Sequence, residues 1–174
     1  MYKTVSVEVP FIITEVAQHK DIKSEILDAI KEMGIFSYIQ EPKQKLFNSD
    51  YHINNSISRL YYPNIEPIIK EVYNNILLAY DIPKESLPLD YQYWIQQYKE
   101  LDYHAKHIHA ACVFSSVYYI DLANDNAKTT FILNNKEIEL EVKEGQVLTF
   151  PSCMPHTSKV NQAKQIKTVC SWNI

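Results

Sequence analysis

Arginine and cysteine are scarce in this chain, and long apolar runs are missing. Its one arginine, Arg59, and a net charge of −4 argue against a general nucleic-acid-binding surface. Three cysteines at unrelated spacing, Cys112, Cys153 and Cys170, fit neither a disulfide framework nor a zinc ribbon and favour reduced thiols. No apolar run approaches about 18 residues and no signal peptide is present, so we expect a soluble protein without a membrane partner.

Glycine is also rare, and the residue types that are abundant instead indicate the kind of genome that encodes the chain. Two glycines stand beside an excess of Lys, Ile, Asn and Tyr, which is typical of an AT-rich genome such as that of a phage or a small marine bacterium. Because the sequence shows neither a signal peptide nor a membrane span, we expect a cytoplasmic protein, in the host cytoplasm if the source is viral. At 174 residues and 46% hydrophobic content, the chain predicts a single domain that buries roughly 70% of its unfolded surface. A homodimer is left open.

The first half of the chain, residues 1–90, predicts helical support and a lid. After an apolar run at Val5–Ile13, apolar residues at helical spacing predict helices over Ile22–Met33, ending at Gly34, and over Ile65–Tyr80. Between them, Gln40–Asn64 has no clear period and reads as a long loop. We expect this loop to cover a binding site with the side chains of Tyr51, Arg59, Tyr61 and Tyr62.

The second half, residues 91–174, predicts a mainly β core. Asn134-Asn135 reads as a two-residue hairpin turn because asparagine tolerates positive φ. Short β-branched and aromatic runs recur at the spacing of an all-β barrel. The expected strands are Tyr91–Tyr98, Lys106–Ala110, Val113–Asp121, Thr129–Leu133, Ile138–Val142, Val147–Phe150, Thr157–Val160 and Lys167–Asn173.

Three histidines near these strands form a candidate metal site. In an extended segment, residues i and i+2 share a face, so His107 and His109 can point at one ion. His156 follows an apolar strand and two prolines, and would complete the set from elsewhere in the fold. A first-row metal held by three neutral imidazoles keeps open positions for substrate and oxygen. The alternative is that these are surface or buried structural histidines.

The same stretches resemble a known family. His107-Ile-His109, followed by Ser115-Ser-Val-Tyr-Tyr119, is similar to the His-x-His and Ser-Gly-Val-Tyr-Tyr signature of a small 2-oxoglutarate/Fe(II) oxygenase family of phages and marine bacteria. Gly145 to His156 resembles its Gly, Phe-Pro-Ser and His motif, and Lys167-Thr-Val-Cys-Ser171-Trp-Asn173 resembles its closing Arg-x-Ser-x-Ser-Phe-Asn strand. The resemblance covers residues 93–174.

This resemblance implies a double-stranded β-helix, a jelly-roll or cupin-like barrel with flanking helices and iron at its mouth. Fe(II) would be bound by the three histidines, with 2-oxoglutarate and O2 as cosubstrates and ascorbate as a candidate reductant. Lys167 stands where the family has arginine and would hold the distal carboxylate of 2-oxoglutarate, with Tyr98 and Gln96 beside it. A solvated lysine is the alternative. Ser116 and Val169 depart from the family's glycine and serine.

The function expected from the resemblance is a 2-oxoglutarate-dependent oxygenase, with hydroxylation as the expected outcome. Its substrate is left open between a prolyl or other protein side chain, a free amino acid or other small molecule, and a nucleotide. One alternative is a three-histidine cupin dioxygenase that needs no 2-oxoglutarate, and another is a non-catalytic barrel used for binding. His104 would replace one of the three ligands if its strand began earlier than Lys106.

Overall fold

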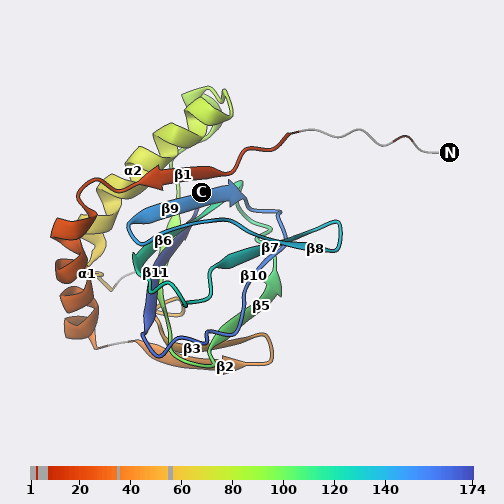
Figure 1. The fold of residues 1–174 in the computed structure, drawn as a ribbon. Coiled ribbons are helices and arrows are strands. Elements are labelled where there is room, and N and C mark those ends of the chain that lie inside the picture. The colour runs from red at the N-terminus through yellow and green to blue at the C-terminus, as the bar shows by residue number, and fades with distance from the viewer. Residues whose placement is uncertain (1–2, 4–7, 35, 55–56) are drawn as a thin grey trace.

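The computed structural model describes residue 3, residues 8–34, residues 36–54 and residues 57–174 (Figure 1). Part of the expected apolar run, residues 5–7, lies outside them, as do residues 55–56 of the expected loop. In chain order the elements are β1 (Ile12–Glu15), α1 (His19–Met33), β2 (Ser37–Glu41), β3 (Gln44–Ser49), α2 (Tyr62–Ala79), η1 (Lys84–Ser86), β4 (Gln92–Tyr98), β5 (Tyr103–His107), β6 (Phe114–Asp121), β7 (Thr129–Leu133), β8 (Lys136–Glu139), β9 (Gln146–Pro151), β10 (His156–Ser158) and β11 (Lys167–Asn173).

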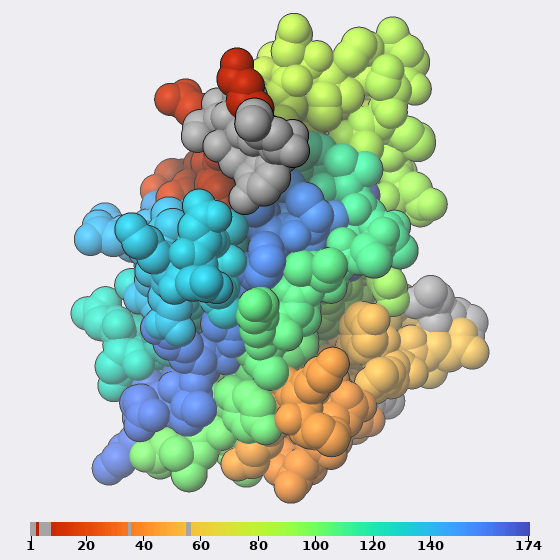
Figure 2. Space-filling view, turned by 90° about the vertical axis from the view of Figure 1, so that its right-hand side faces the viewer, coloured from red at the N-terminus to blue at the C-terminus, as the bar shows by residue number. Residues whose placement is uncertain are grey.

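The described strands form one antiparallel sheet in the order β1-β9-β6-β11-β4-β3-β5-β10-β7-β8, with β2 paired to β3. The sheet curls so that its two halves face each other across a shared apolar interior. That interior contains Leu46 of β3, Tyr119 of β6, Phe131 of β7, Phe150 of β9 and Val169 of β11. Figure 2 shows the outer side of the second half, where the hairpin β2–β3, β5, β10 and the β7–β8 hairpin follow one another. The double-stranded β-helix expected from the sequence is confirmed.

Alternation along the strands separates this interior from a second apolar core under the helices. In β6, Tyr119 faces the barrel interior while Tyr118 and Ile120 face the helices. In β11, Val169 faces the interior and Trp172 faces the helices. Because successive side chains of a strand point to opposite faces, the central strands are buried on both sides.

The two helices lie against the outer face of the first half of the sheet (Figure 1). The apolar stripe predicted for the second helix is confirmed. Its members Ile68, Ile69, Val72, Tyr73 and Ile76 of α2 are buried, and Leu77 packs against the same core while partly exposed. Both helices begin before the expected residue, at His19 rather than Ile22 and at Tyr62 rather than Ile65. No helix in the described ranges is long and apolar enough to cross a membrane.

The largest departure from the expected elements is the hairpin β2–β3, which occupies the first part of the segment predicted to be a loop. β3 pairs with both β4 and β5 and so joins the two halves of the sheet. The barrel therefore includes strands that precede residue 91. The pairing partners lie between 47 residues (Ser49 to Gln96) and 60 residues (Gln44 to His104) away along the chain, so no local pattern signals them. β5 also begins at Tyr103, before the expected Lys106.

The turn predicted at Asn134-Asn135 is confirmed, because both residues have positive φ, 51° and 59°, and connect β7 to β8. Such a pair matches the twist of a two-residue hairpin. β8 itself spans Lys136–Glu139 instead of the expected Ile138–Val142, since the tight turn sets the register Leu133↔Lys136.

Gly145 allows a stability prediction. Its φ is +85°, and an added Cβ would lie 3.0 Å from ring atoms of the buried His19. We expect Gly145→Ala to lower the free energy of unfolding by more than the roughly 1–2 kcal/mol that a left-handed alanine costs alone. Gly34→Ala is the matched control, because Gly34 has φ +58° but its nearest neighbour is 3.8 Å away. Urea unfolding giving equal losses for both variants would contradict the contact with His19.

Candidate active site

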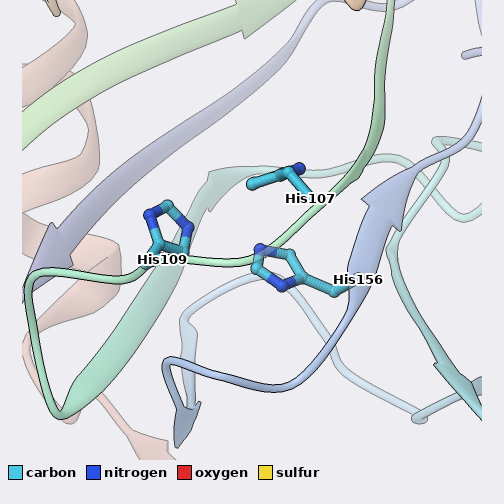
Figure 3. A group of neighbouring side chains, drawn as sticks. All are labelled: His107, His109 and His156. Carbon is cyan, nitrogen blue, oxygen red and sulfur yellow. The ribbon is translucent and has the colours of Figure 1, made fainter.

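Strand pairing brings the three predicted histidines together. His107 ends β5, His156 begins β10, and the two are direct partners in the antiparallel register. His109 follows two residues after the end of β5. One ring nitrogen from each lies within 4.8 Å of the others, the one such group of three potential metal ligands found among the described residues (Figure 3). The side chains of His107 and His109 converge as the sequence predicted, although β5 ends at His107 and does not include His109.

Main-chain hydrogen bonds orient two of these imidazoles. Nδ1 of His107 lies 2.8 Å from the carbonyl oxygen of Ala105, and Nδ1 of His156 lies 2.8 Å from that of Met154. A carbonyl only accepts, so each Nδ1 carries the proton and donates it. The lone pair of each ring is then on Nε2, which is the tautomer that a metal-binding histidine needs.

The third imidazole, that of His109, is held differently. Its Nδ1 accepts a hydrogen bond of 3.3 Å from the side-chain amide of Asn173, and Ser115 Oγ donates to Asn173 Oδ1 at 2.8 Å. Trp94 lies beside the ring, with centroids 6.4 Å apart. His109 is therefore oriented by side chains of β4, β6 and β11 rather than by its own main chain.

Burial keeps all three histidines neutral. It lowers the pKa of His156 to about 3 and that of His109 to about 4, with further lowering from neighbouring histidines. The pKa of His107 is lowered by burial as well. Neutral imidazoles offer lone pairs at pH 7 without first losing a proton, which suits metal binding.

His104 lies next to this group but not in it. The earlier start of β5 is the condition under which His104 was expected to replace a ligand, yet the converging group does not include it. Its ring stacks on that of His107, with centroids 3.9 Å apart and planes at 15°. It thus forms a side wall of the site.

A cavity of about 270 Å³ runs from the histidines into the barrel. Its described lining residues include all four of these histidines and Lys167, and none is an Asp or a Glu. This volume is near the lower limit of small-molecule pockets, about 300 Å³. The cavity accordingly suits a small anionic ligand.

Lys167 is buried at the inner part of this lining, which rules out the alternative of a solvated lysine. Its Nζ donates to Ala127 O and to Ser158 Oγ, both at 2.7 Å, and lies 3.9 Å from the centre of the Tyr98 ring. Burial lowers the pKa of Lys167 to about 7. An anion beside the ammonium would favour its charged form.

Tyr98 and Gln96, the other expected cosubstrate residues, also line the cavity from β4. Gln96 Oε1 accepts a hydrogen bond of 3.2 Å from Ser171. Ser116, which stands where glycine was expected, uses its hydroxyl in a 2.8 Å hydrogen bond with Thr149.

An outer groove of about 810 Å³ adjoins the cavity and shares Tyr51, Ile108, His109 and Asn173 with it. Tyrosines and small side chains supply much of the rest of its lining, and its described residues include no lysine. The groove offers a path for a second, larger ligand to reach His109.

The predicted lid is wrong for two of its side chains. Tyr61 is fully buried and Arg59 is 6% exposed, because both bind the buried carboxylate of Asp50. Asp50 also accepts from the amide of Ile95 at 2.6 Å. These contacts fix the segment against β4, so Arg59 and Tyr61 are part of the core. Tyr51 is half-exposed and packs on Trp94 at the mouth.

The three cysteines are free, as expected, and none belongs to the histidine group. Cys112 Sγ lies 4.0 Å from Ser115 Oγ, Cys153 is exposed and Cys170 is buried.

Sequence reasoning missed Asn173, Ser115 and Trp94 as residues of the site. A usable signal was the two-residue period of the closing strand, because Lys167, Val169, Ser171 and Asn173 share one face and all line the cavity. The same period places Trp94 beside Gln96 and Tyr98 on β4.

The buried histidines predict that the metal-free protein loses stability in mild acid. The histidines of the unfolded chain titrate near pH 6.5, whereas His104 and His156 have pKa values lowered to about 3 when folded. The unfolded chain therefore binds more protons in this interval, so stability is complete above pH 6.5 and falls as the pH decreases. Each such histidine contributes up to about 1.4 kcal/mol per pH unit.

Urea unfolding of chelator-treated protein between about pH 7 and about pH 5 measures this loss. The control is His104→Phe, which keeps a ring stacked on His107 but cannot titrate, and it should show a shallower decline. Identical slopes for the two proteins would contradict the role of His104 in the acid sensitivity.

Comparison of the sequence with protein-family models and with curated proteins gives no match. Solved structures do match. A prolyl-4-hydroxylase from Pseudomonas putida has a TM-score of 0.68 at 12% identity, over 95% of this chain and 91% of its own. A prolyl hydroxylase from Trichoplax adhaerens, in complex with a hypoxia inducible factor peptide, has a TM-score of 0.67 at 12% identity, over 94% and 82%. The chain has the fold of the 2-oxoglutarate/Fe(II) oxygenases.

A third match is a viral collagen prolyl hydroxylase from Paramecium Bursaria Chlorella virus-1 in its 2OG complex. Its TM-score is 0.58 at 13% identity, and the match covers 94% of both chains. At these identities the likeness establishes the double-stranded β-helix. It does not identify a cosubstrate, metal ligands or a substrate for this chain, and any assignment of these rests on the chain's own residues.

Proposed function

We propose that this protein is a 2-oxoglutarate- and Fe(II)-dependent oxygenase, a hydroxylase of the family found in phages and marine bacteria, with residues 1–174 as one domain acting in the cytoplasm. The observation that carries the proposal is a single cavity with three converging neutral imidazoles at its mouth, a buried ammonium inside, and no Asp or Glu among its described lining residues. The histidines suit a cation, and the lysine suits an anion that reaches inward from it.

His107, His109 and His156 would hold Fe(II), since imidazole suits iron and the three rings leave one side of the ion open. Three neutral ligands leave the ion with its full 2+ charge, which dianionic 2-oxoglutarate balances. With 2-oxoglutarate and O2, bound Fe(II) supplies the oxidation of a C–H bond as 2-oxoglutarate is converted to succinate and carbon dioxide. The protein orients these reactants and excludes water from the cavity.

Lys167 would hold the distal carboxylate of 2-oxoglutarate by a charge-assisted hydrogen bond. Its depth in the cavity supports this role, as does the absence, among the described residues, of a carboxylate hydrogen-bonded to its Nζ. Tyr98 lies under the ammonium and Gln96 lines the same wall, so both would contact the bound dicarboxylate.

The substrate would approach along the outer groove, because the groove reaches His109 and is wider than the inner cavity. Its described lining has no lysine, and its one arginine, Arg59, is paired with Asp50. A phosphate backbone would find no free cation there, so we favour a protein side chain or an uncharged small molecule over nucleic acid. One structural neighbour binds a peptide.

A second candidate is a three-histidine dioxygenase without 2-oxoglutarate, which the neutral ligand set favours. A non-catalytic binding barrel is the third. The deciding experiment adds 2-oxoglutarate to Fe(II)-loaded protein without oxygen and then supplies O2 with ascorbate. A visible charge-transfer band on chelation, followed by succinate release, supports the proposal. Oxygen uptake without succinate indicates the second candidate, and no metal binding indicates the third.

A further inference from the structure

The third ligand is set up differently from the other two. His107 and His156 each donate Nδ1–H to a main-chain carbonyl, so Nε2 is free to bind metal. His109 instead accepts at Nδ1 from the amide of Asn173. A neutral imidazole carries one proton, so this proton is on Nε2 of His109. Because Asn173 occupies Nδ1, only Nε2 of His109 is available to a metal. In this tautomer Nε2 carries the proton and therefore has no free lone pair.

A half-turn of the Asn173 amide removes the conflict. Oδ1 would then accept from Nδ1–H of His109, and Nδ2 would donate to Ser115 Oγ. Both orientations occupy the same space, because the amide oxygen and nitrogen are nearly equal in size. Ser115 can serve either one, since a hydroxyl both donates and accepts. Asn173 is half-buried and lines both the inner cavity and the outer groove.

We propose that Asn173 is the positioning residue of the metal site: its amide selects the tautomer of His109, and metal binding requires the orientation in which Asn173 Oδ1 accepts from His109. This inference rests on the proposed three-histidine site. It gives a role to the last motif residue of the closing strand. It also means that the ability of His109 to bind metal depends on Asn173, a side chain that lines the outer groove as well as the cavity.

Zinc is the probe, because it is diamagnetic and binds imidazole. Two-bond ¹H–¹⁵N spectra of the histidine rings identify each tautomer in the metal-free and zinc-loaded protein. For metal-free wild type we expect His107 and His156 protonated at Nδ1 and His109 protonated at Nε2. Zinc should convert His109 to the Nδ1–H form.

Three variants distinguish a positioning role of Asn173 from a purely structural role and from an effect of added charge. Asn173→Asp can only accept, so His109 should already be in the Nδ1–H form without metal, and zinc should bind about tenfold more tightly. Asn173→Ala should bind zinc roughly 10- to 100-fold more weakly. Ser171→Asp is the charge control, because residue 171 lies on the same cavity-lining face of β11 but its hydroxyl bonds Gln96. It should leave His109 in the Nε2–H form.

The positioning role is overturned if His109 is already Nδ1–H in metal-free wild type, or if Asn173→Asp binds zinc no more tightly than Ser171→Asp. Asn173→Asp gives a second reading should Asn173→Ala not fold, since it keeps the shape of the side chain and its effect on the His109 tautomer is read without metal. Loss of the metal site itself is distinguishable. It would show as no zinc binding by wild type, or as unchanged affinity in His109→Ala.

Discussion

Replacing His107 or His156 with alanine should abolish stable metal binding and all metal-dependent turnover. Each variant leaves two of the three ligands. The described cavity lining has no Asp or Glu to take the vacant position, and His104, its fourth histidine, lies outside the converging group. Loss of an outer hydrogen-bonding partner alone weakens metal binding 10- to 100-fold, so loss of a direct ligand should cost more. Elemental analysis and metal titration of the purified variants measure the effect.

Two other histidines serve as controls. His52→Ala should retain wild-type affinity, because the His52 side chain is 58% exposed and its acidic neighbour, Glu41, is 4.0 Å away. His104→Ala should retain one metal per chain, since His104 stacks on His107 without joining the converging group. Purified protein can contain Ni or Zn instead of Fe, because affinity follows the Irving–Williams order. Unchanged metal content in both ligand variants would rule out the three-histidine site.

Removing the Lys167 ammonium should weaken 2-oxoglutarate binding while the metal stays bound. A charge-assisted hydrogen bond contributes about 1.5–3 kcal/mol, which corresponds to roughly 10- to 150-fold in affinity for Lys167→Ala. The buried position of Lys167 makes the loss specific, since the described cavity lining contains no second lysine or arginine. Calorimetric titration of 2-oxoglutarate into metal-loaded protein gives the affinity.

Lys167→Arg tests whether charge alone is sufficient. The charge is kept, but the planar guanidinium must fit where Nζ lies 3.9 Å from the Tyr98 ring, so we expect binding between that of wild type and Lys167→Ala. Lys159→Ala is the control, because Lys159 is exposed and paired with Glu137. Wild-type affinity in Lys167→Ala would place the anchor elsewhere or favour the dioxygenase that does without 2-oxoglutarate.

The Asp50 network explains why the segment before α2 behaves as part of the scaffold. Its carboxylate binds Arg59, Tyr61 and the amide of Ile95, so it joins this segment to β4. β4 contributes Trp94, Gln96 and Tyr98 to the cavity. Of the four side chains expected in the lid, Tyr51 is the one in the described cavity lining, where it is half-exposed and packs on Trp94.

Short-range patterns in the sequence were sufficient for features that depend on neighbouring residues. Asn134-Asn135 predicted its hairpin turn, since positive φ is a property of the residues themselves. The helical stripe of α2 likewise follows from a backbone period of 3.6. His107 and His109 do converge, but His109 lies beyond the end of β5, so the strand period does not explain its position. The resemblance in the closing strand directed attention to Lys167, whose side chain does line the cavity.

Tertiary structure decided whatever depends on which distant strands pair. β3 joins the two halves of the barrel through partners 47 to 60 residues away, and a segment without local periodicity gave no sign of it. Burial of Arg59 and Tyr61 depends on Asp50 being held by β4, and the orientation of His109 depends on Asn173, 64 residues further along the chain. Local propensity determines the backbone of a turn or a helix. Hydrogen-bond partners across a barrel are determined by strand register, which exists only once the chain has folded.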